Sequence, residues 1–224
     1  MMSNQRWKTL WDICCFNTLY FNFKYLPFHL AIRLPIWVSR RVRIRKGKGE
    51  IIINGNVYTG MIRIGLDSVG IFDNKKSRSI WQVYGKVIFN GKCFLGHGCK
   101  ISVGQNASLS FGNNFHCSAE TSISTVLNIT IGADCLFSWD ILIMDTDWHK
   151  ITDIKGNVQN PPKPIRIGNH VWIGCRTTIT KGISIADGTI IAAGSTISKD
   201  VIEHNCIVGK NPQQVIRHDV RWIL

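Results

Sequence analysis

Isoleucine recurs at every sixth position near the C-terminal end of the chain, and each isoleucine is followed by Gly, Thr, Ala or Ser. A period of six matches neither an α-helix nor a flat strand, whose side chains repeat every 3.6 and 2 residues. Short repeats that each contribute one aliphatic side chain must stack to bury it, so this pattern predicts a coiled prism. The six positions are Ile167, Ile173, Ile179, Ile185, Ile191 and Ile197.

The same period continues upstream in three triplets that are separated by extra residues. With three faces per turn, each coil takes about eighteen residues and successive coils stack at roughly 4.8 Å. A small residue is needed where the chain turns a corner against the next coil. We therefore expect an all-β solenoid with earlier coils built on Phe89, Leu95 and Ile101, on Phe111, Cys117 and Ile123, and on Ile131, Phe137 and Ile143.

The extra residues between triplets enter only after the third face of a coil. They therefore leave the prism along one edge, and the longest insertion spans residues 145–164. Insertions on one side of a solenoid usually form its binding surface. We expect this loop to carry the function.

Composition agrees with a folded protein, because 45% of the 224 residues are hydrophobic. The eight cysteines include no pair separated by two residues, so we expect reduced thiols with structural roles. The N-terminal region lacks a basic patch followed by an apolar core and a small-residue cleavage site. We therefore expect a cytoplasmic protein.

The formal charge of +13 is concentrated ahead of the repeats, where residues 1–50 hold ten Lys or Arg against two acidic residues. Polar residues and prolines interrupt the aromatic stretch 13–38. It therefore lacks the run of about 20 apolar residues that a membrane-spanning helix requires. We expect residues 1–50 to form an N-terminal cap ahead of a β-helix domain at 51–224. Two roles stay open: a helical cap on the first coil, or a peripheral membrane contact through residues 1–48.

The best catalytic candidate is His149, in the loop segment Asp-Thr-Asp-Trp-His-Lys at 145–150. An imidazole titrates near neutral pH, so it can take a proton from a hydroxyl or amine and return it to a leaving group. Asp145 or Asp147 lies close enough in sequence to orient the ring, as in a histidine and carboxylate pair. Spacing does not decide between the two aspartates.

Three segments resemble the hexapeptide-repeat acyltransferases, in the branch of the galactoside and maltose O-acetyltransferases. They are residues 165–174, residues 190–200, and Gly209 to Pro212 followed by Val215 to Arg217. The resemblance implies a left-handed parallel β-helix and transfer of an acetyl group from acetyl-CoA to a sugar hydroxyl. It also implies a homotrimer whose active sites lie between neighbouring prisms.

The resemblance further assigns individual residues. His149 matches the catalytic base of the family. Cofactor-binding positions are matched by Trp172, Cys175, Ala193, Ser198, Lys199 and Arg217. With the basic, aromatic N-terminal segment, we expect the acceptor to be a surface-polysaccharide or lipid-linked glycan precursor at the inner membrane face, and no nucleic-acid partner.

Three alternatives are less well supported. An amino-sugar N-acetyltransferase would use the same base, and a non-catalytic β-helix scaffold would need only the repeats. A zinc enzyme on this prism would need three converging imidazoles, but His97, His116, His149 and His170 are 19, 33 and 21 residues apart. We therefore expect no metal site.

Overall fold

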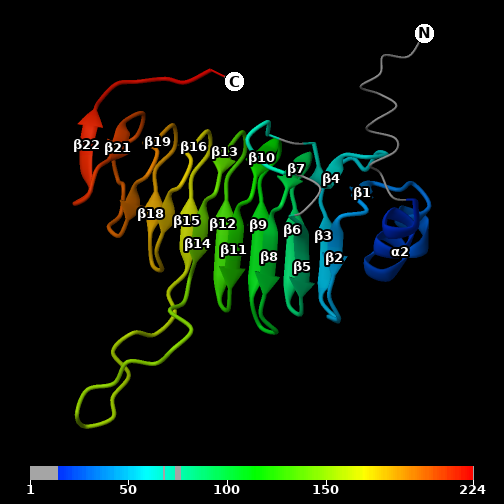
Figure 1. The fold of residues 1–224 in the computed structure, drawn as a ribbon, viewed down its shortest axis with the longest axis horizontal. Helices are drawn as coiled ribbons and strands as arrows, with labels where there is room; N and C mark the ends of the chain where they lie inside the picture. Colours follow the sequence, from blue (N-terminus) through cyan, green and yellow to red (C-terminus); the bar gives the residue numbers. More distant parts are fainter. Residues whose placement is uncertain (1–14, 68, 74–76, 224) are drawn as a thin grey trace.

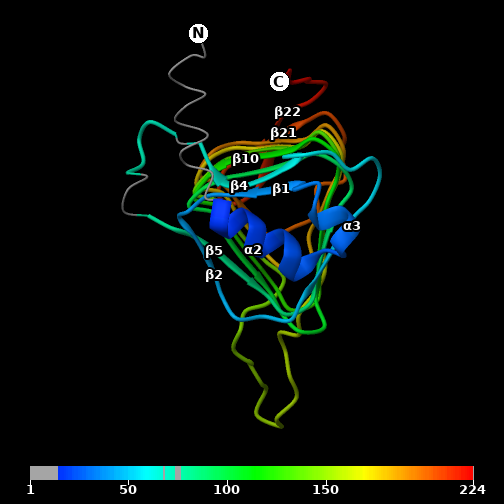
Figure 2. The same cartoon turned by 90° about the vertical axis from the view of Figure 1, so that its right-hand side faces the viewer.

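The computed structural model describes residues 15–67, 69–73 and 77–223. Within these residues the chain winds into a parallel β-helix with three faces, and two short helices lie across its N-terminal end (Figure 1). Figure 2, which looks along the prism, shows that the coils superpose, that the loop at residues 145–164 projects from one edge, and that the described part of a shorter loop between β4 and β5 leaves the prism at another edge.

Each face of the prism is one sheet, and all described neighbouring strands are parallel except the last pair, β21 and β22. The nine-stranded face contains β1 (Ile36–Val38), β4 (Ile62–Leu66), β7 (Cys93–His97), β10 (Phe115–Ala119), β13 (Leu136–Trp139), β16 (Trp172–Ile173), β19 (Ile190–Ile191), β21 (Ile207–Gly209) and β22 (Gln214–Arg217). The seven-stranded face contains β2 (Val42–Ile44), β5 (Ser79–Val83), β8 (Lys100–Val103), β11 (Ser122–Thr125), β14 (Leu142–Met144), β17 (Thr178–Ile179) and β20 (Thr196–Ile197). The six-stranded face contains β3 (Glu50–Ile53), β6 (Lys86–Phe89), β9 (Ser108–Phe111), β12 (Asn128–Ile131), β15 (Ile165–Ile167) and β18 (Ser184–Ile185).

The strand register confirms the predicted ladders of apolar residues. On every face the six-residue positions of successive coils are direct partners, and all of them are buried. The ladders are Phe89, Phe111, Ile131, Ile167 and Ile185; then Leu95, Cys117, Phe137, Ile173 and Ile191; then Ile101, Ile123, Ile143, Ile179 and Ile197.

The small residues after the ladder positions lie where the backbones of neighbouring coils come closest. A Cβ atom added to Gly112 would lie 2.2 Å from the carbonyl carbon of Gly132, and one added to Gly132 would lie 2.4 Å from the carbonyl oxygen of Gly168. Distances that short are repulsive, so a side chain at either corner would push the coils apart. Small residues are therefore required at these corners, as the repeat pattern predicts.

The β-helix begins earlier than the boundary expected at residue 50. β1, β2 and β3 already form one complete coil, and Ile36 and Val38 pair with Ile62 and Ile64 of the next. The described part of the cap is therefore limited to residues 15–35. No regular six-residue spacing runs through these first coils, because turns of different length separate their strands.

The two cap helices are α2 (Cys15–Tyr25) and α3 (Phe28–Ala31). Phe21 of α2 is fully buried and packs edge-on against Trp81 of β5, with 5.2 Å between ring centroids. Asn22 and Thr18 hydrogen-bond to the edge strand β1: the Asn22 amide bonds both backbone groups of Ile36, and the Thr18 hydroxyl bonds both backbone groups of Val38. Unpaired edge groups invite association, and α2 satisfies them here. Within the described residues, α2 and α3 thus form a helical cap, whereas residues 1–14 of the predicted cap lie outside the described part of the chain.

The described helices include none that is long and apolar enough to cross a lipid bilayer. The six cysteines whose side chains the structure describes are free thiols, and five of them are buried. Burial raises the pKa of the Cys93 and Cys117 thiols well above the ordinary value, which keeps them protonated and unreactive. These cysteines fill space in the prism.

Candidate active site

The long loop leaves the prism at the edge between the seven-stranded and six-stranded faces. It starts after β14 and returns at β15 (Figure 1). Its two ends are joined where the Lys163 backbone N–H donates to the Asp145 carbonyl, at 3.0 Å. Farther out, Thr152 and Val158 form an antiparallel bridge. The loop is therefore a closed hairpin with a defined base, and His149 lies near that base.

Asp145 anchors the base of the loop to the coil beneath it. Its side chain is fully buried and accepts hydrogen bonds from the Thr125 hydroxyl and from three consecutive backbone N–H groups at residues 126–128, each at 2.9 Å. A buried carboxylate that accepts four hydrogen bonds is a structural group. Asp145 does not contact the His149 ring, so the structure does not show the orienting role that the sequence suggested for it.

Asp147 is exposed and holds the loop to the next coil. Its carboxylate forms an ion pair with Lys181, which follows β17, and accepts a hydrogen bond of 2.8 Å from the Asn160 amide. These two contacts, led by the Lys181 hydrogen bond, hold the pKa of the Asp147 carboxyl below its ordinary value. Asp147 also makes no contact with the His149 ring, so neither predicted histidine and carboxylate pair forms in this chain.

His149 lies at the end of a tight turn that presents its side chain to solvent. Its backbone N–H donates to the Asp147 carbonyl at 2.7 Å, and Trp148 between them has a φ of +62°. A bulky residue rarely adopts this left-handed conformation, which costs of the order of 1–3 kcal/mol and is found most often at functional sites. Within the described part of the chain, the imidazole has no hydrogen-bond partner, so its nitrogens are accessible to a ligand.

Two residues that the sequence did not single out complete the turn. The Asn160 amide joins the Asp147 carboxylate to the His149 carbonyl, with bonds of 2.8 and 2.9 Å. Lys181 also donates to the Asn160 carbonyl at 3.1 Å. The repeat pattern could have indicated Lys181. It follows Ile179 by two residues, and Asp145 follows Ile143, the partner of Ile179, by the same interval. Equivalent positions on stacked coils lie next to one another.

The predicted cofactor residues lie in three places. Cys175 and Ala193 turn the edge between the nine-stranded and seven-stranded faces, and the Gly194 N–H donates to the Cys175 carbonyl at 2.8 Å. Ala193 and Gly194 are exposed, and a Cβ added to Gly194 would meet nothing within 4 Å. These small residues therefore leave a shallow, open edge along two coils. A long, thin ligand such as a pantetheine arm fits this edge.

Ser198 and Lys199 lie on the edge between the seven-stranded and six-stranded faces, which also carries the loop of His149. Their backbone N–H groups both donate to the Gln213 side chain at 3.1 Å. Arg217 is exposed on β22, which covers the last coil of the nine-stranded face. The structure therefore does not bring Ser198 and Lys199 together with Cys175 and Ala193 in one chain.

Trp172 lies on the nine-stranded face and is about one-third exposed. Its indole N–H donates to the Ser138 hydroxyl at 3.2 Å. The C-terminal tail returns to this point, where Trp222 stacks on His170 with ring centroids 4.1 Å apart and lies 6.2 Å from Trp172. The Trp222 N–H also donates to the His170 carbonyl at 2.8 Å. No motif in the sequence indicates that Trp222 of the tail lies beside Trp172.

Comparison with known proteins agrees with this architecture. The family described as bacterial transferase hexapeptide (six repeats) matches residues 164–199. Galactoside O-acetyltransferase from Escherichia coli (strain K12) is 33% identical over 117 residues, which are 52% of this chain and 56% of that protein. Polysialic acid O-acetyltransferase from Escherichia coli O1:K1 / APEC is 31% identical over 126 residues, 56% of this chain and 38% of that protein. The matched part of the chain thus spans about half of the length of the first of these relatives and less than half of the second.

Two further matches extend over more of the chain. An uncharacterized 24.8 kDa protein in the cps region of Klebsiella pneumoniae is 27% identical over 204 residues, 89% of this chain and 86% of that protein. The crystal structure of the polysialic acid O-acetyltransferase OatWY superposes with a TM-score of 0.56 at 24% identity, covering 65% of this chain and 82% of that one. It shows that the fold is shared.

The molecule is therefore a left-handed parallel β-helix with a helical N-terminal cap and a short C-terminal tail. Residues 164–199 carry the bacterial transferase hexapeptide repeat, and about half of the chain is similar to two sugar O-acetyltransferases. Both statements confirm what the sequence resemblance predicted.

Proposed function

We propose that the protein is an acetyl-CoA-dependent O-acetyltransferase that acts on a sugar hydroxyl. The observation that carries the proposal is the accessible imidazole of His149, held by a strained turn at the base of the longest loop among the described residues. The relatives named for galactoside and polysialic acid O-acetylation support a glycan acceptor. We propose a surface-polysaccharide or lipid-linked glycan precursor as that acceptor, used on the cytoplasmic side of the membrane.

The donor binds along the edge formed by Cys175, Ala193 and Gly194 in this proposal. Bound acetyl-CoA supplies the acetyl group as a thioester. Trp172 offers an indole face beside the same edge, and apolar contact with an aromatic ring suits the pantetheine arm. Lys199 and Arg217 are exposed cations that suit phosphate groups.

His149 acts as the general base. It accepts the proton from the acceptor hydroxyl as the oxygen attacks the thioester carbonyl, and it then returns the proton to the departing sulfur. General base catalysis of this kind contributes about 10²–10⁴-fold to the rate. The ion pair of Asp147 with Lys181 fixes the loop, so these two residues position His149 without touching its ring.

We further propose that the active enzyme is a homotrimer. His149 extends from one edge of the prism, and the proposed donor residues Cys175 and Ala193 line a different edge. Two prisms placed side by side bring the first edge of one chain against the second edge of its neighbour. A cyclic arrangement of three chains repeats this contact and closes, which gives three equivalent sites.

The test is an acetyl-transfer assay with acetyl-CoA and an array of mono- and oligosaccharides, with products detected by mass. The proposal expects one acceptor class to gain an acetyl ester, which mild base removes. A product stable to mild base would be an amide and would replace oxygen by nitrogen as the nucleophile. No acetylated product, together with no thermal stabilisation by acetyl-CoA, would favour a non-catalytic scaffold.

A further inference from the structure

The N-terminal end of the prism presents an exposed aromatic surface on its cap helices. The inward face of α2 holds Thr18, Phe21, Asn22 and Tyr25, and these side chains are buried against the first coils. The opposite face of the same helix is also apolar. The aromatic surface consists of Phe16, Leu19, Tyr20 and Phe23 of α2 with Phe28 and Ile32 at α3.

The aromatic surface is strongly exposed. Phe16 and Phe28 are 74% and 72% exposed, respectively. Phe16 stacks on Tyr20, with centroids 6.3 Å apart, and Phe23 lies 6.0 Å from Phe28. Single exposed apolar residues are normal, but a contiguous aromatic patch indicates contact with a membrane or a protein.

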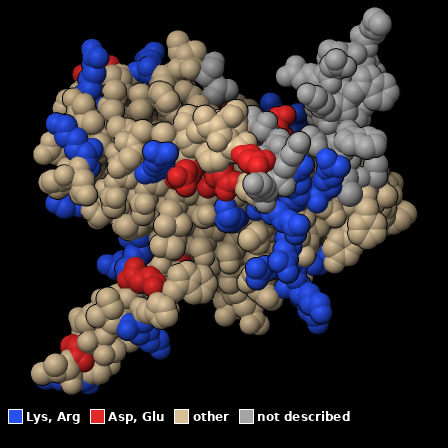
Figure 3. Space-filling view, viewed as in Figure 1, with Lys and Arg blue, Asp and Glu red and all other residues tan. Residues whose placement is uncertain are grey.

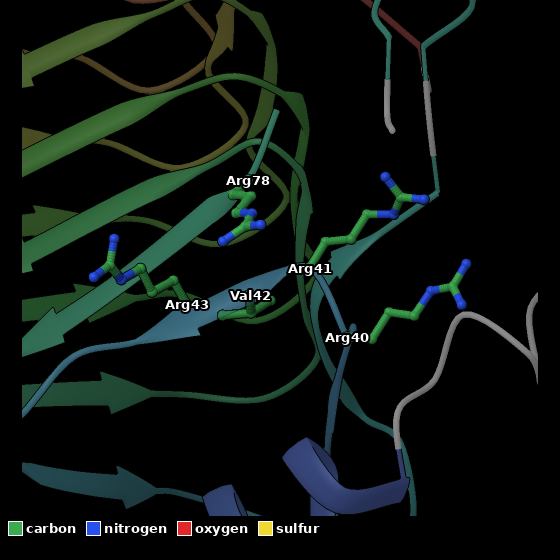
Figure 4. A pocket seen from close by; sticks show the side chains of 5 residues that line it. All are labelled: Arg40, Arg41, Val42, Arg43 and Arg78. Carbon is green, nitrogen blue, oxygen red and sulfur yellow. The ribbon is translucent and has the colours of Figure 1, made fainter. Parts of the chain in front are cut away.

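A basic pocket adjoins this aromatic surface. It has a volume of about 670 Å³ and is lined by Arg40, Arg41, Arg43 and Arg78 around Val42. Figure 4 shows three of these arginines on the chain leading through β2 and the fourth just before β5. Basic side chains also gather at this end of the molecule in the space-filling view (Figure 3).

The pocket and the aromatic surface are physically connected. The Asn17 amide of α2 donates to the Ser39 carbonyl at 3.0 Å, and Ser39 directly precedes Arg40. The basic run continues along the chain to Arg45, Lys46 and Lys48, so residues 33–50 hold seven Lys or Arg and one acidic residue. Aromatic and basic groups therefore form one surface at this end.

We propose that this surface docks on an anionic lipid membrane. Aromatic and aliphatic side chains enter the headgroup region, while neighbouring arginines bind lipid phosphates, as in proteins that lie in the interface plane. Arginine suits this role because its planar guanidinium forms two parallel hydrogen bonds to a phosphate. Charge complementarity favours a lipid surface over a second copy of this basic chain, whose like charge would repel.

The experiment is vesicle flotation of the full chain. Phosphatidylcholine vesicles are compared with vesicles that also contain phosphatidylglycerol, at low and at high salt. We expect binding to the anionic vesicles alone, with a loss of roughly tenfold or more when salt shortens the Debye length from about 10 Å to about 4 Å. Equal binding to both vesicle types, or no binding, would overturn the proposal.

Three variants separate the two contributions. Arg40→Gln, Arg43→Gln and Arg78→Gln together should weaken vesicle binding roughly 100-fold, because each basic residue near an anionic surface contributes about fivefold. A second variant, with Phe16→Ser, Phe23→Ser and Phe28→Ser combined, should abolish flotation. The matched control, Lys155→Gln, Arg166→Gln and Arg221→Gln, removes the same charge elsewhere and should keep binding. A control that loses binding equally would mean that net charge alone is responsible.

Two further measurements identify another occupant. Inorganic phosphate that displaced the protein from vesicles at matched ionic strength would assign the pocket to free phosphate. An aromatic triple variant that bound vesicles normally but changed the sedimentation of the protein would assign the surface to self-association. Either result would overturn membrane docking, and none of these tests depends on acetyl transfer.

Discussion

The prism and the loop at residues 145–164 obtain their structure in different ways. In the prism one contact is repeated, so Phe111 lies between Phe89 and Ile131 just as Ile179 lies between Ile143 and Ile197. In the loop each contact is made once: Asp145 holds its base, and Asp147 holds its turn through Lys181. Stability should therefore depend on the prism, and activity on the loop.

The largest expected effect separates activity from stability in the loop. His149→Ala should lower turnover about 10²–10⁴-fold, because the imidazole is the proposed general base. The free energy of unfolding should not change, since the ring is exposed and has no described partner. Steady-state kinetics and denaturant unfolding measure the two quantities. His204→Ala, another exposed histidine, should leave both unchanged, and full activity in His149→Ala would refute its assignment.

The reverse separation is expected in the prism. Phe111 is fully buried, stacks on Phe89 at 5.5 Å and contacts Phe115 at 4.9 Å. Phe111→Ala should lower the free energy of unfolding by about 3–5 kcal/mol, since it opens a cavity in a packed core. Ile154→Ala at the fully exposed tip of the loop should change it by less than about 0.5 kcal/mol. Equal losses in the two variants would contradict the comparison.

Asp145 tests the connection between the two regions. Asp145→Ala leaves the backbone N–H groups of residues 126–128 without their acceptor. Unsatisfied donors at these partly buried positions are costly, so the free energy of unfolding should fall by about 1–3 kcal/mol. Activity should fall too, because the base of the loop is released. Asp153→Ala, in the outer part of the loop, is the matched carboxylate, and a similar loss of stability there would argue against a special role for Asp145.

The smallest expected effect concerns the pKa of Asp147. Lys181 is the main cause of its low pKa, so Lys181→Met should raise the carboxyl pKa toward the ordinary value. Because the folded pKa is depressed, the stabilisation exists above the unfolded pKa and disappears as pH falls through the folded pKa. That acid-dependent loss should be smaller in the variant, where the Asn160 hydrogen bond still lowers the Asp147 pKa. Carboxyl chemical shifts followed by NMR titration measure it, and an unchanged Asp147 pKa would remove Lys181 as the cause.

The sequence predicted the repeated parts down to individual residues. The ladder through Ile167, Ile173 and Ile179 was visible because its period is constant and each position needs only an aliphatic side chain. The first coil was missed, since β1 to β3 are separated by turns of unequal length. Asn22 interrupts the apolar stretch 13–38 in the sequence, but in the fold it satisfies the backbone of Ile36 in the edge strand.

The site was only partly predictable for a related reason. Position in the loop indicated His149, but the partners of Asp145 lie about one coil earlier and those of Asp147 lie on the next coil. Side-chain direction at a turn is not fixed by spacing, so the sequence could not distinguish an anchor from an orienting carboxylate. The predicted cofactor residues lie on two different edges, which could be recognised only once the fold was known.

The central claim is that His149 of one chain works with the Cys175 and Ala193 edge of its neighbour. Co-expression of two differently tagged inactive chains, His149→Ala and Ala193→Trp, tests it most directly, after sedimentation has shown that each remains trimeric. Random mixing leaves about one quarter of all contacts between chains intact, so the co-expressed population should regain about a quarter of the wild-type activity, and trimers that carry both tags about a third. Mixed trimers as inactive as either parent would mean that both groups must come from the same chain, and would contradict the account.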